Sequence, residues 1–339
     1  MPFINDILRH RSLSIVGLEK NTGKTVCLNY VLRRLNEVGA RAAITSIGVD
    51  GEQTDSVYAT AKPEVTLYEG MQFITSEKHY LQRRLVSQLL EVDSQRTSLG
   101  QLVTGEVLCR GKILLSGAAS SEKLRSQIDH FKEQGMELTI VDGALSRLSL
   151  ASPTVTDAMI LATGAAVSLH LPQLISRTKF LHQLINLPEV DATMRQRLSH
   201  ITQGIWAIDG DGQPHDLHIA SVFLLGRGDN QDDLFRYGTT LFVSGAVSTQ
   251  LVKYLASQKQ IKDITLIVRD FTKFFVTPEV YAEYIRRGGT MLVLQQSKLL
   301  AITFNPTSPT GYTMPSRETC EKLSEALGTP VYDVMKIND

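Results

Sequence analysis

One segment near the N-terminus constrains the fold of this chain more than any other. Residues 14–28 read Ser-Ile-Val-Gly-Leu-Glu-Lys-Asn-Thr-Gly-Lys-Thr-Val-Cys-Leu. An apolar run over 13–16 breaks at Gly17, and helical spacing of apolar residues resumes after Lys24, which predicts a buried strand, a loop and a helix. Backbone N–H groups in such a loop, with the partial positive charge of the helix N-terminus, can hold phosphate oxygens. The segment therefore predicts a phosphate-binding loop.

The spacing within this loop differs from the commonest form, because five residues rather than four separate its first glycine from its Gly-Lys pair. The alternative is a helix that simply begins with Gly-Lys-Thr after a turn, but the flanking strand and amphipathic helix favour the phosphate loop. We expect the Lys24 ammonium to reach the β and γ phosphates of a nucleotide and the Thr25 hydroxyl to bind Mg²⁺. The residues expected around the phosphates are Gly17, Lys20, Asn21, Thr22, Gly23, Lys24, Thr25 and Val26.

Three acidic residues follow predicted strands and are candidates for the metal. Asp50 and Asp55 lie in the polar loop after a strand predicted over 42–47, and Asp142 lies near the end of an apolar strand over 138–144. Because ligands bind at the carboxyl ends of parallel strands, these loops should lie beside the phosphate loop. We expect Lys24, Asp50 and Asp142 to act in catalysis and Thr25, Asp50, Asp55 and Asp142 to hold Mg²⁺. The alternative for each aspartate is an ordinary solvated turn.

The length of the chain, 339 residues, exceeds what a single core usually holds. A run of turn-forming residues over 209–215 indicates a boundary near 205–216, and we predict two α/β domains, 1–205 and 217–339. Beyond the strands already named, strands are predicted over 111–116, 156–164, 219–225, 240–244, 264–268, 291–294 and 300–304. Helices are predicted over 24–39, 81–90, 122–134, 171–187, 247–256, 278–287 and 317–327.

Charge and cysteine content restrict the partners and the compartment. Lys plus Arg and Asp plus Glu both number 35, so bulk electrostatics favour neither nucleic acid nor an anionic membrane as a partner. The three cysteines are widely spaced and are typical of reduced thiols in a cytoplasmic protein. No apolar run is long enough to span a membrane.

Residues 12–200 resemble the dethiobiotin synthetase class of phosphate-loop proteins. The resemblance is carried by the Gly-x5-Gly-Lys-Thr loop, by the acidic loop after the second strand, and by Val141-Asp142-Gly143, where that class usually has Glu-Gly. It implies an N-terminal P-loop NTPase domain with a mostly parallel sheet, in which Thr25, Asp142 and one of Asp50 or Asp55 hold Mg²⁺. Aspartate in place of glutamate shortens the reach toward the metal.

The whole chain is similar to the ATP-binding subunit of the reactivase for lysine 5,6-aminomutase, an enzyme of lysine fermentation. The similar segments are 45–52, the pair Lys62-Pro63, 142–147 running into 156–164, and 305–311. The resemblance implies ATP and Mg²⁺ as cofactors, and as partners a second reactivase subunit and an adenosylcobalamin-dependent aminomutase. We also expect that the chain can form a homodimer.

Two other functions fit the same loop. The first is an ATP-dependent carboxylate ligase of the dethiobiotin synthetase type acting on a small acid, and the second is a nucleotide-binding adaptor without turnover. Basal ATPase activity separates them, since turnover stimulated by a protein favours the reactivase, and strict dependence on a metabolite favours the ligase.

Overall fold

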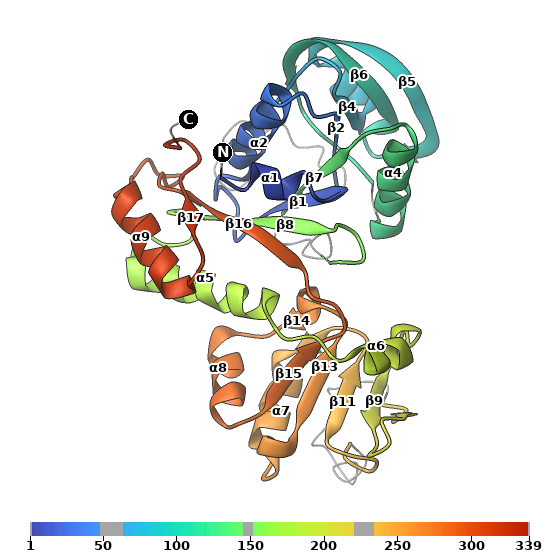
Figure 1. Cartoon of the computed structure of the whole chain (residues 1–339), viewed down its shortest axis with the longest axis vertical. Helices are drawn as coiled ribbons and strands as arrows, with labels where there is room; N and C mark the ends of the chain where they lie inside the picture. The colour runs from blue at the N-terminus through green and yellow to red at the C-terminus, as the bar shows by residue number, and fades with distance from the viewer. Residues whose placement is uncertain (1, 48–63, 119, 145–151, 220–233, 338–339) are drawn as a thin grey trace. The chain divides into compact units, whose positions relative to one another are not determined.

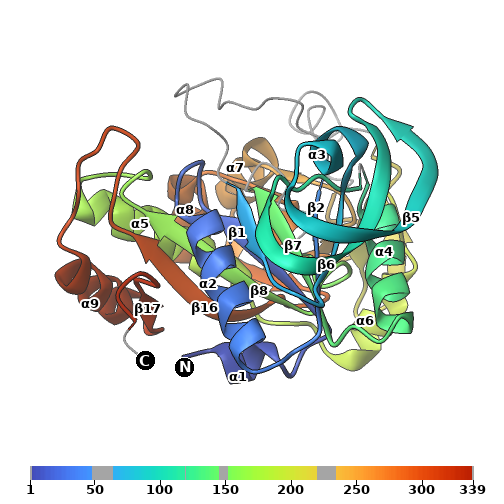
Figure 2. The ribbon, with the colours of Figure 1, turned by 90° about the horizontal axis from the view of Figure 1, so that it is seen from above.

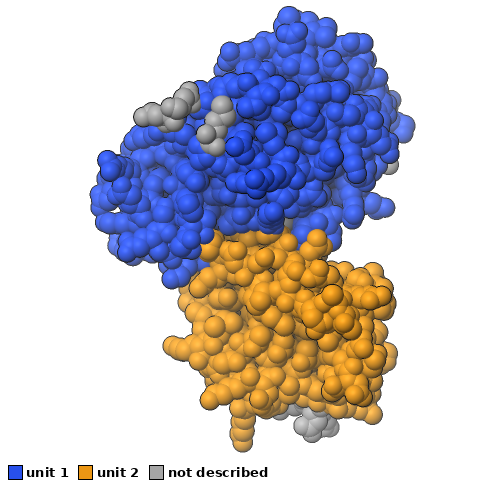
Figure 3. All heavy atoms as spheres, in the orientation of Figure 1, with its two compact units in different colours: residues 1–179, 298–339 blue, residues 180–297 orange. Residues whose placement is uncertain are grey.

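The computed structural model describes residues 2–47, 64–118, 120–144, 152–219 and 234–337. The chain forms two compact units, which Figure 3 shows in two colours: unit 1 comprises residues 1–179 and 298–339, and unit 2 comprises residues 180–297. No helix in the described ranges has the length and apolar character needed to cross a bilayer.

This division differs from the predicted domains 1–205 and 217–339. The C-terminal segment belongs to unit 1 because β16 (Lys298–Asn305) pairs in parallel with β8 (Ala158–Gly164). The predicted boundary over 205–216 is a hairpin inside unit 2 rather than a linker, since β9 (Ile205–Ile208) and β10 (Pro214–Asp216) pair antiparallel there. The Asp209 carboxylate fixes the turn by accepting hydrogen bonds from the backbone N–H groups of Asp211 and Gln213.

In its described residues, unit 1 is built on a ten-stranded, mostly parallel sheet in the order β17-β16-β8-β1-β7-β2-β4-β6-β3, with β5 paired to β6 (Figure 1). The strands from β17 to β4 are parallel to their neighbours, and the pairings of β6 are antiparallel. The strands not yet given are β1 (Ser12–Gly17), β2 (Ala42–Ser46), β3 (Val65–Leu67), β4 (Gln72–Ser76), β5 (Arg84–Thr97), β6 (Gly100–Ile113), β7 (Leu138–Ala144) and β17 (Val331–Tyr332).

Strand β1 lies in the middle of this sheet, between β7 and β8, as its apolar sequence requires. Leu13, Ile15 and Val16 are fully buried, which is the burial expected of a parallel strand covered on both faces. Helix α2 (Lys24–Glu37) follows and lies alongside β1 (Figure 2), with the predicted apolar stripe of Leu28, Val31, Leu32 and Leu35 buried. The predicted order of strand, loop and helix is confirmed.

Further helices of unit 1 pack on the sheet. In α4 (Ser121–Glu133), Leu124 and Ile128 join a buried cluster with Val141 of β7, and the Ser120 hydroxyl caps its N-terminus. The remaining helices are α1 (Ile4–Ile7), α3 (Glu77–Leu81), α5 (Leu171–Ile185), which continues into unit 2, and α9 (Ser316–Leu327).

The helix predicted over 81–90 is wrong, because residues 84–97 form strand β5. Leucines at helical spacing suggested the helix, yet Val86, Leu89 and Leu90 are between 39% and 55% exposed and cover no core. Strand β5 pairs instead with β6 across a tight turn that ends at Gly100, whose φ is 91°. The strand predicted over 111–116 is the last part of β6, which ends at Ile113.

Unit 2 is a smaller α/β unit, and its described residues form a five-stranded sheet in the order β10-β9-β11-β13-β15. Strands β11 (Thr240–Val243), β13 (Thr265–Val268) and β15 (Thr290–Val293) are parallel, as predicted. The predicted helices are present as α7 (Thr249–Ser257) and α8 (Pro278–Arg286), with α6 (Ala192–Ser199) and the small strand pair β12 (Val247–Ser248) and β14 (Phe274–Phe275) in addition. The strand predicted over 219–225 lies, except for its first residue, outside the described residues.

Candidate functional site

The 17–25 loop connects β1 to α2 at the carboxyl edge of the unit 1 sheet. The Leu18 N–H donates to the Ala162 carbonyl of the neighbouring β8 at 2.8 Å. Inside the loop, the buried Thr22 hydroxyl donates to the Glu19 carbonyl at 2.9 Å. Asn21 and Gly23 adopt left-handed backbone angles, with φ of 61° and 89°. The loop is thus held in one conformation by contacts to β8 and by its own turn.

The N-terminus of α2 faces this loop. Lys24 is the first helical residue, and the residue before it, Gly23, has no side chain that could accept from the first N–H groups. The N–H groups of Lys24, Thr25 and Val26 have no carbonyl one turn earlier within the helix, whereas the Cys27 N–H donates to the Gly23 carbonyl at 2.9 Å. These N–H groups and the helix dipole favour an anion at the loop.

The Lys24 side chain folds back across the loop toward β7. Its Nζ lies 3.9 Å from Oδ1 of Asp142, and each side chain is about one-fifth exposed, at 20% and 22%. Gly17 makes this path available, since a Cβ there would lie 2.8 Å from Cγ of Lys24 and 2.5 Å from Oγ1 of Thr22. The structure therefore brings Gly17, Lys24 and Asp142 together.

Asp142 has an unsatisfied oxygen at this site. Its Oδ1 is buried and accepts no hydrogen bond within the described part of the chain. The Lys24 Nζ, 3.9 Å away, is close enough for ion pairing but too far for a hydrogen bond. Its backbone is fixed, since the Ser46 hydroxyl of β2 donates to the Asp142 carbonyl at 3.2 Å. A buried carboxylate oxygen without a donor is costly unless it is completed by a cation or another ligand.

Asn305, which we did not predict as a site residue, also contacts the loop. It ends β16, and its Nδ2 donates to the Asn21 carbonyl at 3.2 Å. A Cβ at Gly23 would lie 2.7 Å from Cβ of Asn305, so the two backbones approach closely. The only sequence signal was the polar Asn-Pro-Thr-Ser-Pro segment after a strand, and strand ends are polar in many proteins.

A second ion pair involves the loop directly. Glu19 Oε1 lies 2.5 Å from Nη2 of Arg177 on α5. Arg177 was not predicted as a site residue, because the local sequence of an amphipathic helix does not distinguish an arginine that contacts a site from one that is solvent-exposed.

The other predicted residues differ in how the structure places them. Lys20 and Asn21 are exposed on the loop, Val26 is 37% exposed and Thr25 is half-buried. Asp50 and Asp55 lie outside the described residues, so their predicted roles stay predictions. Among the residues that are described, no group of three or more His, Cys, Asp or Glu side chains is arranged to hold a metal. Mg²⁺ commonly takes only one or two protein carboxylates, with phosphates and waters completing its shell.

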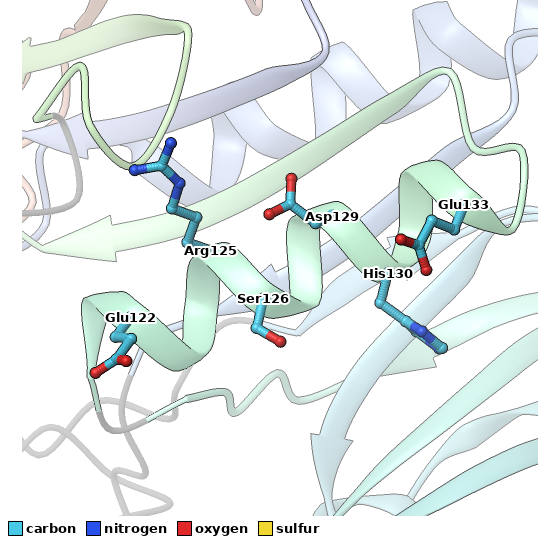
Figure 4. Close-up of a pocket in the computed structure, with 6 residues that line it drawn as sticks. All are labelled: Glu122, Arg125, Ser126, Asp129, His130 and Glu133. Atoms are coloured by element: carbon cyan, nitrogen blue, oxygen red, sulfur yellow. The ribbon is translucent and has the colours of Figure 1, made fainter.

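A surface hollow elsewhere on unit 1 contains none of the predicted residues. All of its lining side chains project from the single helix α4 (Figure 4): Glu122, Arg125, Ser126, Asp129, His130 and Glu133. Acidic and basic groups alternate there in the pattern of a solvated helix face, and we assign it no function.

Comparison with known proteins found no matching family model, no matching curated protein and no matching solved structure.

Proposed function

We propose that unit 1 binds ATP with Mg²⁺ at the 17–25 loop and hydrolyses it. The observation that carries the proposal is the pairing of Lys24 with Asp142 across the loop, with a buried Asp142 oxygen that has no hydrogen-bond donor among the described residues. A lysine at a helix N-terminus and a carboxylate on the adjacent strand are the two charges that a phosphate and its metal require. Their approach depends on the glycine at position 17.

Each residue has a distinct task in this proposal. The backbone N–H groups at the start of α2 hold phosphate oxygens, and the Lys24 ammonium binds the β and γ phosphates. Asp142 and the Thr25 hydroxyl are the described residues that would hold Mg²⁺. When bound, Mg²⁺ neutralises phosphate charge and so favours transfer of the γ phosphoryl group. Asp50 or Asp55 would orient the attacking water or add a metal ligand.

The use made of this ATP is proposed from the sequence resemblance. We propose that hydrolysis serves a partner protein, as in reactivation of an adenosylcobalamin-dependent aminomutase together with a second subunit. One similar segment, 305–311, begins with the asparagine that contacts the loop, which supports a link between that segment and the nucleotide.

Replacing Lys24 tests the proposal. Lys24→Ala should abolish ATP binding measured by isothermal titration calorimetry, because the phosphates lose the Lys24 ammonium, which lies across the loop near Asp142. The matched control is Lys322→Ala on α9, where Nζ makes a surface ion pair with Glu318 at 2.6 Å, and it should bind ATP like the wild type. Wild-type affinity in Lys24→Ala would refute the phosphate-loop assignment.

ATPase assays then separate the three functions. Turnover without a metabolite, raised by a partner subunit or an inactivated cobalamin enzyme, is expected for the reactivase. Strict dependence on a small carboxylic acid would assign the chain to the ligases instead, and binding without turnover would assign it to the adaptors.

A further inference from the structure

The 17–25 loop carries a negative charge where an anion is proposed to bind. Glu19 is the only acidic residue of the loop, and it lies three residues from Thr22, whose hydroxyl donates to the Glu19 carbonyl. A carboxylate in a phosphate-binding loop repels the ligand unless another charge compensates it. The structure supplies such a charge from a distant part of the sequence.

Arg177 of α5 is the compensating group. Its Nη2 lies 2.5 Å from Oε1 of Glu19, and its Nη1 donates to the Val167 carbonyl at 3.1 Å. These two contacts orient the guanidinium, whose planar fork of donors can serve both partners at once. The Arg177 and Glu19 side chains are 47% and 33% exposed, so the pair adds little to the free energy of unfolding.

Helix α5 is itself fixed beside the loop. Thr178, the residue after Arg177, is fully buried, and its Oγ1 lies 2.9 Å from Oγ1 of Thr163 on β8. Strand β8 also accepts the Leu18 N–H of the loop through Ala162. The helix that carries Arg177 and the loop that carries Glu19 therefore share one anchoring strand.

We infer that Arg177 is a positioning residue for the nucleotide, an inference that rests on the proposed function. It neutralises Glu19 and holds the Glu19 backbone where its carbonyl accepts the Thr22 hydroxyl. Without Arg177, the Glu19 charge has no compensating cation from α5, and the loop loses this ion pair. The dominant loss is electrostatic, so it should grow with the number of phosphates on the ligand.

A double-mutant cycle tests this assignment. Isothermal titration calorimetry with Mg²⁺ compares the wild type, Arg177→Met, Glu19→Gln and the double variant, using ATP, ADP and adenosine as ligands. We expect Arg177→Met to weaken ATP binding on the order of tenfold, ADP less, and adenosine not at all. Glu19→Gln should bind ATP at least as tightly as the wild type, because it leaves the Arg177 cation uncompensated, and adding it to Arg177→Met should restore ATP binding.

Unit 2 offers a matched control. Arg195 and Glu189 form a pair of the same length, 2.5 Å, with similar side-chain exposure of 42% and 36%. Arg195→Met should leave ATP affinity unchanged, which shows that loss of a surface ion pair alone does not weaken binding.

The outcomes separate this inference from the proposed function. A wild type that binds no nucleotide overturns both. A wild type that binds ATP, with a double variant as weak as Arg177→Met or with equal losses for all three ligands, overturns the neutralising role alone.

Discussion

Replacing Asp142 with asparagine tests whether this carboxylate serves the proposed binding of Mg²⁺ rather than the proposed binding of phosphate. The substitution keeps the size and shape of the side chain and removes its charge, so the packing of β7 should not change. In the structure this charge lies 3.9 Å from the Lys24 ammonium. Coulomb's law gives an attraction of about 1 kcal/mol at that distance in water and about 4 kcal/mol at an effective dielectric constant of 20. Both side chains are about four-fifths buried, so the attraction lies between these limits.

That attraction competes with binding of phosphate by Lys24. In Asp142→Asn the ammonium no longer has this partner, and no carboxylate at position 142 repels the incoming phosphates. ATP binding in EDTA should therefore be unchanged or tighter. In Mg²⁺ the variant should bind ATP on the order of tenfold more weakly than the wild type, and its turnover should fall on the order of 100-fold, because a charge beside the transferred phosphoryl group is lost.

Calorimetric titrations of ATP in Mg²⁺ and in EDTA, with a phosphate-release assay, measure these effects. Asp129→Asn, on the exposed face of α4 that Figure 4 shows, is the matched control and should behave like the wild type under both conditions. Equal losses of affinity with and without Mg²⁺ would refute the metal role and leave Asp142 a structural residue at a strand end.

Two further predictions concern the loop and the thiols. Gly17→Ala places a Cβ 2.5 Å from Oγ1 of Thr22, so ATP affinity should fall at least tenfold in titrations while circular dichroism shows an unchanged fold. Burial raises the pKa of the Cys27 thiol to about 12, so in the folded protein Cys27 should resist a thiol reagent that labels the exposed Cys109, as mass spectrometry of the labelled peptides can show.

The parts of the fold that the sequence predicted are those in which local pattern and burial agree. The stripe of Leu28, Val31, Leu32 and Leu35 is both helical in spacing and fully buried in α2. Residues 84–90 share the helical spacing, but antiparallel pairing with β6 decides their conformation. That pairing depends on β6 also joining β4, a contact between strands that no local pattern encodes.

The candidate site shows the same limit. Gly17 and Lys24 lie in one segment, and Asp142 lies near the end of an apolar strand, so residue type and strand order were enough to predict that the three lie close together. Asn305 contacts Asn21 across 284 positions of the sequence. Arg177 lies on α5, the helix that follows β8, and pairs with Glu19 near the N-terminus. Neither contact follows from the residues near it. The return of β16 to the first sheet was missed for the same reason, since only the parallel pairing with β8 reveals it.

The two ion pairs at the loop would have opposite consequences for the nucleotide that we propose to bind there. Glu19 and Arg177 can stay paired when phosphate binds, since their contact only removes a repulsive charge. Lys24 and Asp142 would not stay paired, because Lys24 would bind phosphate in place of Asp142 and Asp142 would bind Mg²⁺ in place of Lys24. Binding of the phosphates and binding of the metal therefore each remove a competitor of the other, so their affinities should be coupled through this one pair. Asp142→Asn should remove the coupling between phosphate affinity and Mg²⁺ affinity, whereas Arg177→Met should leave it intact. The comparison distinguishes a residue that exchanges partners, Asp142, from one that only compensates charge, Arg177.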